Sequence, residues 1–146
     1  MMSITTENPV EARARAAIEY ACDQAGLDPA GARLIRDYAN LVYELPAERV
    51  VLRLADASTP GKFERLRTSV RVTRWLAEQD FPAVRPLDVR QPVAAEGFFV
   101  TFWHHERHVG PPPDPVALGA VLRRLHALPP VPFDLPTYDP FGSVRR

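Results

Sequence analysis

Three short runs of aliphatic and β-branched residues, separated by brief polar segments, constrain the fold of this chain most. The runs cover residues 32–35, 41–45 and 50–54. Their length and composition are typical of β-strands. Connections of so few residues join antiparallel strands, because a parallel pair needs a crossover of a dozen residues or more. The sequence therefore predicts three consecutive antiparallel strands.

A long helix is predicted after the third strand. The segment Ser58-Thr59-Pro60-Gly61 breaks the strand pattern, and residues 62–79 then carry apolar side chains at spacings of three and four, which is the helical period. Two further extended runs follow at 87–93 and 97–103, joined by a segment of hairpin length. The prediction is an α+β fold in which a five-stranded antiparallel sheet has a long helix inserted between its third and fourth strands.

Helices are also predicted at both ends of the chain. Residues 9–27 form the first, where Asn8 can cap the helix and proline suits the first turn. The last helix covers 114–128 and starts in a similar way, with Asp114 as the cap and Pro115 in the first turn. Residues 104–113 between sheet and helix are rich in proline and predict a linker, and prolines recur from 129 to 146, which predicts an extended tail.

Composition excludes several classes of partner. The 146 residues suffice for one domain with a core. Eighteen basic residues balance eighteen acidic ones, so no overall field attracts nucleic acid or an anionic membrane. No apolar run reaches the length of a membrane span, and the single cysteine, Cys22, fits a reducing compartment and a buried position. We expect a cytoplasmic protein with no membrane or nucleic-acid partner.

An ordered series of short segments resembles the first lobe of the aminoglycoside phosphotransferase family, which has a protein-kinase-like fold. The similarity spans about residues 30–142 and is carried by 40–45, 49–54, 72–78, 82–86, 91–93, 100–103 and 118–128. The resemblance implies a kinase-like small lobe at 1–103, a hinge at 104–113 and the start of a C-terminal lobe at 114–146. It also implies that ATP binds between the sheet and a second, larger lobe.

The resemblance implies five nucleotide contacts in this chain. Arg53 falls where the family places its phosphate-pairing base, and a guanidinium can bind two phosphate oxygens at once. Tyr38 and Asn40 lie in the turn that would close over the phosphates, although this turn contains no glycine. Trp103 and Phe102 would form apolar walls for the adenine. The alternatives are an exposed strand arginine, ordinary turn residues, and core packing for Phe102.

Two further groups of polar residues have open interpretations. The helical glutamate that pairs with the basic strand residue in kinases is replaced by Ser69, and Glu64, five residues earlier, either approaches Arg53 or is a surface charge. His104, His105, Glu106 and His108 are metal-ligand types close together, but the neighbouring prolines favour a polar linker. We expect no metal site.

The sequence lacks the family's His-Gly-Asp catalytic loop and its later Mg²⁺-binding aspartate, so no catalytic residue is assigned and Mg²⁺ is expected only with a complementing C-terminal lobe. One hypothesis is therefore an ATP-binding lobe that is catalytically incomplete. The alternative is a non-catalytic interaction module or homodimer, which would use the apolar stripe of the last helix or the sheet to bind a protein. An autonomous kinase would need every metal ligand in trans. The stripe comprises Leu118, Val121, Leu122 and Leu125.

Overall fold

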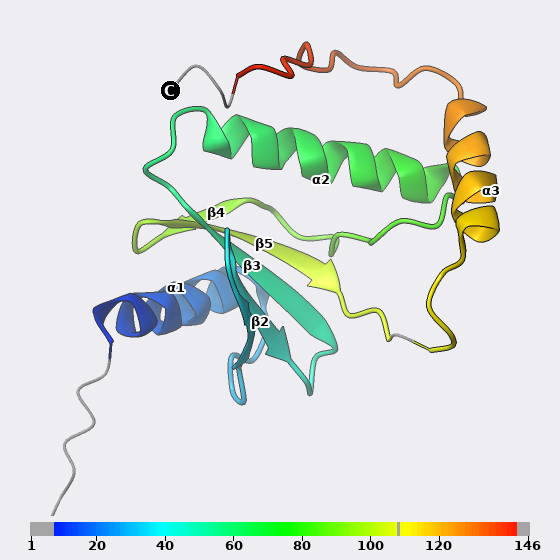
Figure 1. The fold of residues 1–146 in the computed structure, drawn as a ribbon. Helices are drawn as coiled ribbons and strands as arrows, with labels where there is room; N and C mark the ends of the chain where they lie inside the picture. The colour runs from blue at the N-terminus through cyan, green and yellow to red at the C-terminus, as the bar shows by residue number, and fades with distance from the viewer. Residues whose placement is uncertain (1–7, 108, 143–146) are drawn as a thin grey trace, which may run out of the picture.

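A computed structural model describes residues 8–107 and 109–142 of the chain and has the predicted order of helices and strands (Figure 1). It confirms the α+β fold with a five-stranded antiparallel sheet. The helices are α1 (Pro9–Ala25), α2 (Lys62–Glu78) and α3 (Pro115–His126). The strands are β1 (Arg33–Asp37), β2 (Leu41–Leu45), β3 (Val50–Asp56), β4 (Val93–Ala95) and β5 (Phe98–His104).

The sheet has the strand order β1-β2-β3-β5-β4, and all neighbours are antiparallel. The two longest strands, β3 and β5, pair along their whole length, from Val50 opposite His104 to Asp56 opposite Phe98. They come from opposite sides of α2 in the sequence. Their pairing therefore joins the N-terminal hairpins to the second half of the chain.

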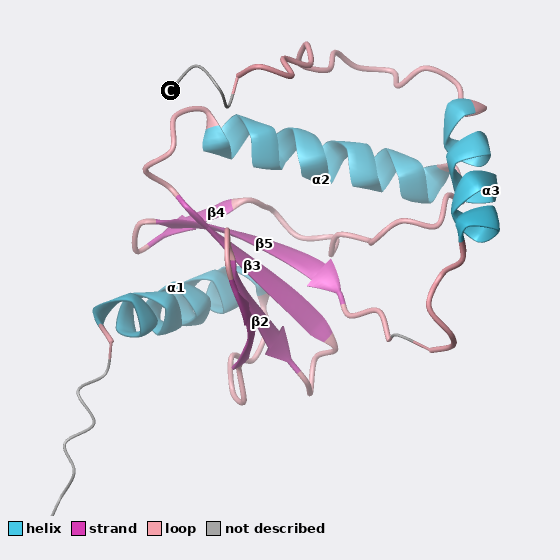
Figure 2. Cartoon of the chain, in the orientation of Figure 1, coloured by secondary structure: helices cyan, strands magenta, loops and turns pink. Residues whose placement is uncertain are grey.

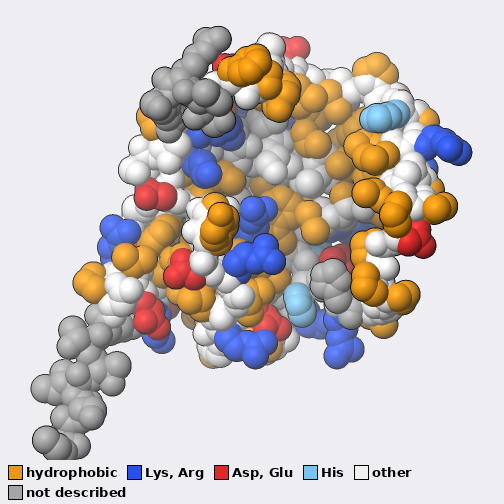
Figure 3. All heavy atoms as spheres, viewed as in Figure 1, with side chains coloured by type: hydrophobic (Ala, Val, Ile, Leu, Met, Phe, Trp, Pro, Cys, Tyr) orange, Lys and Arg blue, Asp and Glu red, His pale blue; other side chains and the backbone are white. Residues whose placement is uncertain are grey.

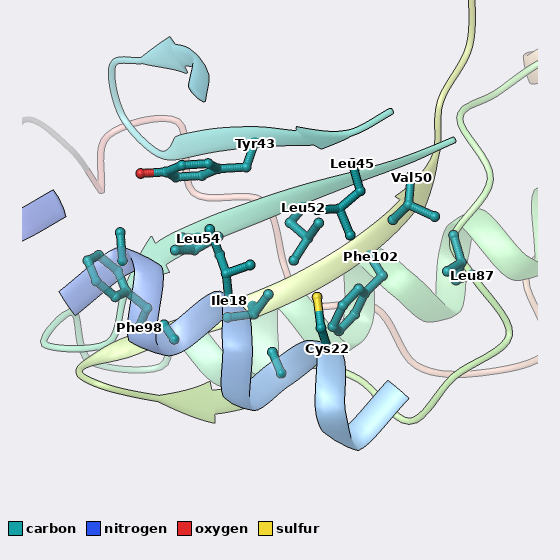
Figure 4. Close-up of a cluster of buried hydrophobic side chains, with 14 residues drawn as sticks. Ile18, Cys22, Tyr43, Leu45, Val50, Leu52, Leu54, Leu87, Phe98 and Phe102 are labelled. Atoms are coloured by element: carbon teal, nitrogen blue, oxygen red, sulfur yellow. The ribbon is translucent and has the colours of Figure 1, made fainter. Parts of the chain in front are cut away.

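Helix α1 covers one face of the sheet and forms the core with it. Every second residue of β3 and β5 points to this face, and Leu52 and Phe102 are completely buried there. Figure 4 shows Ile18 and Cys22 of α1 pointing toward the strands from the other side of this core. The core confirms the expectation that Cys22 is a buried small residue.

Local chemistry fixes both ends of α1. The Asn8 side chain accepts a hydrogen bond of 3.1 Å from the N–H of Val10, as the sequence predicts. The helix ends at Ala25, two residues before the predicted end, because Gly26 adopts a left-handed conformation with φ of 70°. The N–H of Leu27 then donates to the carbonyl of Cys22 at 2.9 Å, which closes the helix.

Helix α2 lies on the other side of the sheet from α1 (Figure 1). Phe63 of α2 meets Phe99 of β5 edge to face, with 5.3 Å between the ring centroids. Phe99 alternates with the core residues of β5, so it points away from α1. The two helices therefore sandwich the sheet near β4 and β5.

The fourth strand differs from the prediction of 87–93. Only Val93–Ala95 pairs with β5 as a strand. Upstream, the Gln91 side chain takes the place of a backbone ladder: its Oε1 accepts from the N–H of Phe102 at 2.8 Å and its Nε2 donates to the carbonyl of Leu87 at 2.9 Å. Pro92 also has no N–H to donate. Leu87 is buried and its N–H donates to the carbonyl of Phe102 at 3.0 Å, but the pairing here is limited to an isolated bridge between Pro86 and Trp103.

Helix α3 and the segment after it lie against α2. Arg124 donates to the carbonyl of Asp80 at 3.1 Å and lies 5.9 Å from the centre of the Phe81 ring. Figure 2 shows residues after α3 running back along α2 as a loop, where the Arg71 guanidinium lies 4.1 Å from the centre of the Phe133 ring. Residues 129–142 contain neither helix nor strand, as expected for the tail.

Some expectations fall outside the described residues, namely those on 1–7, on His108 and on 143–146. Within 8–107 and 109–142, no helix combines the length and apolar character needed to cross a membrane. Three leucines of α3 remain exposed, with 56% of Leu118, 44% of Leu122 and 40% of Leu125 accessible, and Val121 is partly buried. The predicted stripe is therefore present and largely uncovered.

Candidate functional site

A hollow of about 620 Å³ lies on the face of the sheet opposite α1. The turn between β1 and β2, the middle of β2 and β3, and the end of β5 with the residues after it form its walls. On the face drawn in Figure 3, positively charged side chains lie near the middle beside hydrophobic ones and a histidine. The polar and aromatic residues that line the hollow include Arg36, Tyr38, Asn40, Arg53, Trp103 and His104.

Arg53 points into this hollow because of strand alternation. Its neighbours Leu52 and Leu54 are buried in the core under α1, so the side chain between them faces the other way. It stands opposite Val42 on β2 and Thr101 on β5. The side chain of Arg53 is exposed and makes no ion pair or hydrogen bond within residues 8–107 and 109–142. Its charge is therefore available to a ligand of the hollow.

The two aromatic candidates, Trp103 and Phe102, lie on opposite faces of the sheet. Trp103 lines the hollow opposite Val51, is 5% exposed, and donates from Nε1 to the Thr101 hydroxyl at 2.9 Å. Phe102 points to the other face and is completely buried in the core under α1. Successive residues of a strand face opposite sides of the sheet, so only one of the two can reach the hollow. Phe102 is a core residue and does not form a wall of the hollow.

The turn between β1 and β2 brings Tyr38 and Asn40 to the rim of the hollow. Tyr38 is 90% exposed. The Asn40 side-chain oxygen is buried and has no hydrogen-bond partner within the described residues. A buried polar atom without a partner costs about 1–3 kcal/mol, and such atoms are rare in native proteins. This oxygen accepts hydrogen bonds, so it can bind only a donor, whereas a phosphate oxygen would have to accept from the amide nitrogen of Asn40.

Helix α2 supplies no counter-charge to Arg53. Glu64 pairs with Arg67 at 2.7 Å on the exposed side of the helix, which agrees with its interpretation as a surface charge. Ser69 is exposed, and no residue of α2 lines the hollow. The kinase-type ion pair between strand and helix is thus not formed by these residues.

The lining of the hollow suits an anion better than a divalent cation. Arg36 and Arg53 contribute two positive charges, and Glu106 is the one carboxylate among the described lining residues. No group of three or more His, Cys, Asp or Glu in the described part of the chain is arranged to hold a metal ion. His104 and His105 also line the hollow, whereas His108 lies outside the described residues. The residues of this site do not provide a Mg²⁺ site of their own.

Sequence reasoning missed Arg36 as part of this site. It lies on β1, whose irregular pairing with β2 decides the direction of its side chain. A strand pattern with a strict period of two would not reveal this direction. The only sequence signal is its position immediately before the turn that carries Tyr38 and Asn40.

Comparison with known proteins gives one match. The model of the phosphotransferase enzyme family matches residues 8–143. The matched range includes α1, α2, α3 and the five strands of the sheet, together with each residue that lines the hollow. No curated protein and no solved structure matches the chain.

Proposed function

Because the chain belongs to the phosphotransferase enzyme family, we propose that its hollow binds ATP and that the chain acts as the small lobe of an aminoglycoside-phosphotransferase-like small-molecule kinase. The observation that carries this proposal is the guanidinium of Arg53, which has no partner among the described residues, in a hollow whose described lining contains one carboxylate. Phosphoryl transfer depends mainly on positioning the phosphates and neutralising their charge, and Arg53 supplies both functions to a bound phosphate.

The other residues that line the hollow can be assigned to the adenine or to the phosphates of a nucleotide. Trp103 and Val51 provide an apolar surface for the adenine, and Asn40 provides an amide beside the phosphate end. The N–H groups of His104 and His105 already donate to the carbonyls of Arg85 and Arg49, at 2.9 Å each. A backbone N–H that donates to the edge of the base therefore belongs to a residue after His105.

The proposal includes catalytic incompleteness. The sequence holds no His-Gly-Asp loop, and Glu106 is the one carboxylate among the described residues of the hollow. Mg²⁺ and the acceptor hydroxyl both require carboxylates beside the phosphates. We therefore expect phosphate transfer only in the presence of a complementing C-terminal lobe, with Mg²⁺ bound at the junction of the two lobes.

Titration calorimetry with ATP and ADP tests the proposal. Arg53→Ala should weaken ATP binding by roughly 10- to 100-fold, because hydrogen bonds to charged groups contribute about 1.5–3 kcal/mol. Arg33→Ala is the matched control, since Arg33 is also an exposed strand arginine but pairs with Glu44 away from the hollow. Absence of binding by the unaltered chain, or equal affinity in Arg53→Ala, would refute the proposal.

The exposed face of α3 favours a second candidate, a non-catalytic interaction module that forms a homodimer. Leu118, Leu122 and Leu125 are each at least 40% exposed on this helix. Apolar side chains grouped on one helix face are typical of an interface. Light scattering should then give the mass of a dimer that dissociates in Leu122→Glu. A monomer at all concentrations would count against this candidate.

We also propose a cytoplasmic location for this protein, whichever of the two functions it has. Cys22 is the sole cysteine of the chain and is a free, buried thiol. A free thiol is compatible with a reducing compartment. Fractionation of the producing cells, with the protein detected by antibody, tests this location directly.

A further inference from the structure

Strand β1 contains a bulge that changes the direction of its side chains. Leu34 stands opposite Tyr43, whereas Arg36 stands opposite Val42, so Ile35 is an extra residue between two consecutive pairs. Without the bulge, Leu34 and Arg36 would share one face of the sheet. With it, Leu34 shares the face of the buried Tyr43, toward α1, and Arg36 shares the face of Val42. The bulge therefore turns Arg36 into the hollow.

The pairing places Arg36 and Arg53 on either side of Val42. Val42 of β2 stands opposite Arg36 of β1 and opposite Arg53 of β3. The backbones of two strands separated by a third lie about 10 Å apart, since neighbouring strands are spaced by about 4.8 Å. Both arginines are exposed and line the same hollow. Two flexible side chains at this separation can converge on one ligand above Val42.

No residue in the described part of the chain neutralises either arginine. Arg36 and Arg53 have no ion pair within residues 8–107 and 109–142. By contrast Arg33, on the same strand as Arg36, pairs with Glu44 at 2.6 Å, and this hydrogen bond holds the pKa of Glu44 below its usual value. Of the two arginines on β1, Arg33 outside the hollow has an ion-pair partner, and Arg36 inside the hollow has none among the described residues. Two like charges in one hollow favour an anion with more than one charged group.

We propose that Arg36 is a second phosphate-binding residue, and that Arg36 and Arg53 bind neighbouring phosphate groups of one polyphosphate chain. This inference rests on the proposed nucleotide function of the hollow and narrows its ligand to nucleoside diphosphates and triphosphates. A nucleoside monophosphate has one phosphate and engages one guanidinium. The hollow therefore selects ADP and ATP over AMP.

Calorimetric titration of the full chain with ATP, ADP, AMP and inorganic triphosphate tests the inference. Arg36→Ala should weaken binding of ATP and ADP by roughly tenfold or more and change AMP binding by less than about threefold. Arg36→Lys keeps the positive charge but loses the bidentate hydrogen bonding of a guanidinium. Its affinity for ATP and ADP should therefore lie between that of Arg36→Ala and that of the unaltered chain. Arg33→Ala should leave all four affinities unchanged, and circular dichroism checks that each variant is folded.

The outcomes separate this inference from the proposed function. If ATP binding depends on Arg53 but Arg36→Ala retains the affinity within about threefold, the role of Arg36 is overturned and the nucleotide function stands. Arg36-dependent binding of inorganic triphosphate without any binding of ATP supports the two-arginine site and overturns the nucleotide function. Binding of neither ligand overturns both. Equal weakening of AMP and ATP in Arg36→Ala overturns the selection for polyphosphates.

Discussion

Phe102 and Trp103 are consecutive residues of β5, yet Phe102 lies in the core under α1 and Trp103 lines the hollow on the opposite face. Both side chains are nearly inaccessible, at 0% and 5% exposure. Phe102 is enclosed between α1 and the sheet, whereas Trp103 faces the hollow in which we propose that the ligand binds. The two residues should therefore respond differently to substitution.

Phe102→Ala should lower the free energy of unfolding by about 3–5 kcal/mol, since it leaves a large cavity among fully buried side chains. Urea denaturation measures this loss. Phe141→Ala is the control, because Phe141 is 62% exposed and its removal should change stability by at most about 0.5 kcal/mol. A loss below about 1 kcal/mol in Phe102→Ala would contradict the core position.

Trp103 should report nucleotide binding by fluorescence. The chain has two tryptophans, Trp75 on α2 and Trp103, and only Trp103 lines the hollow. Adenine that stacks on the indole of Trp103 should change the fluorescence emission of this residue, because the base then replaces the present surroundings of the ring. The change on addition of ATP should persist in Trp75→Phe and disappear in Trp103→Phe. A signal that survives in Trp103→Phe would place the nucleotide elsewhere.

Cys22 should make stability depend on pH in the alkaline range. Burial, followed by the negative charges of Glu48 and Asp28, raises the pKa of the Cys22 thiol from 9.0 to about 11. Between these values the unfolded chain releases the thiol proton and the folded chain retains it, so stability is full below pH 9 and falls as pH rises. The loss amounts to about 3 kcal/mol once pH exceeds the folded pKa, at 1.4 kcal/mol per pKa unit.

The comparison with Cys22→Ala isolates this contribution. Unfolding is measured by urea between pH 8 and pH 11 for both proteins, with about 1.4 kcal/mol expected per shifted pKa unit. The unaltered chain should lose more stability over this range than Cys22→Ala. Tyr43, whose pKa burial also raises, remains in both proteins and cancels in the difference. Parallel pH profiles would contradict the burial of a protonated thiol.

Arg124 should hold α3 against the end of α2. Its hydrogen bond to the carbonyl of Asp80 and its position beside the Phe81 ring link the two helices. Arg124→Ala should make amide hydrogens of α3 exchange roughly three- to tenfold faster, as expected for the loss of one hydrogen bond. Arg123→Ala is the control, because Arg123 is the adjacent exposed residue. Equal exchange in the two variants would show that α3 is held in another way.

Local signals allowed much of the fold to be predicted from the sequence. The caps Asn8 and Asp114 act on N–H groups two and three residues away, at 3.1 Å and 2.7 Å, so a short stretch of sequence identifies them. The alternation of β3 is equally local, and it is sufficient to place Arg53 on the face opposite Leu52 and Leu54. The prediction for β4 was misplaced because the Gln91 side chain, rather than a backbone ladder, binds the N–H of Phe102.

The sequence by itself determined the order of the elements and the face of Arg53, because helix caps, strand alternation and turn residues act over a few neighbouring positions. The tertiary structure decided which residues meet across the sheet. The bulge in β1 depends on its pairing with β2, and the second partner of β3, beside β2, is β5 rather than β4, which comes earlier in the sequence. The two arginines of the hollow are 17 residues apart in numbering, from Arg36 to Arg53, and only this pairing brings them to either side of Val42.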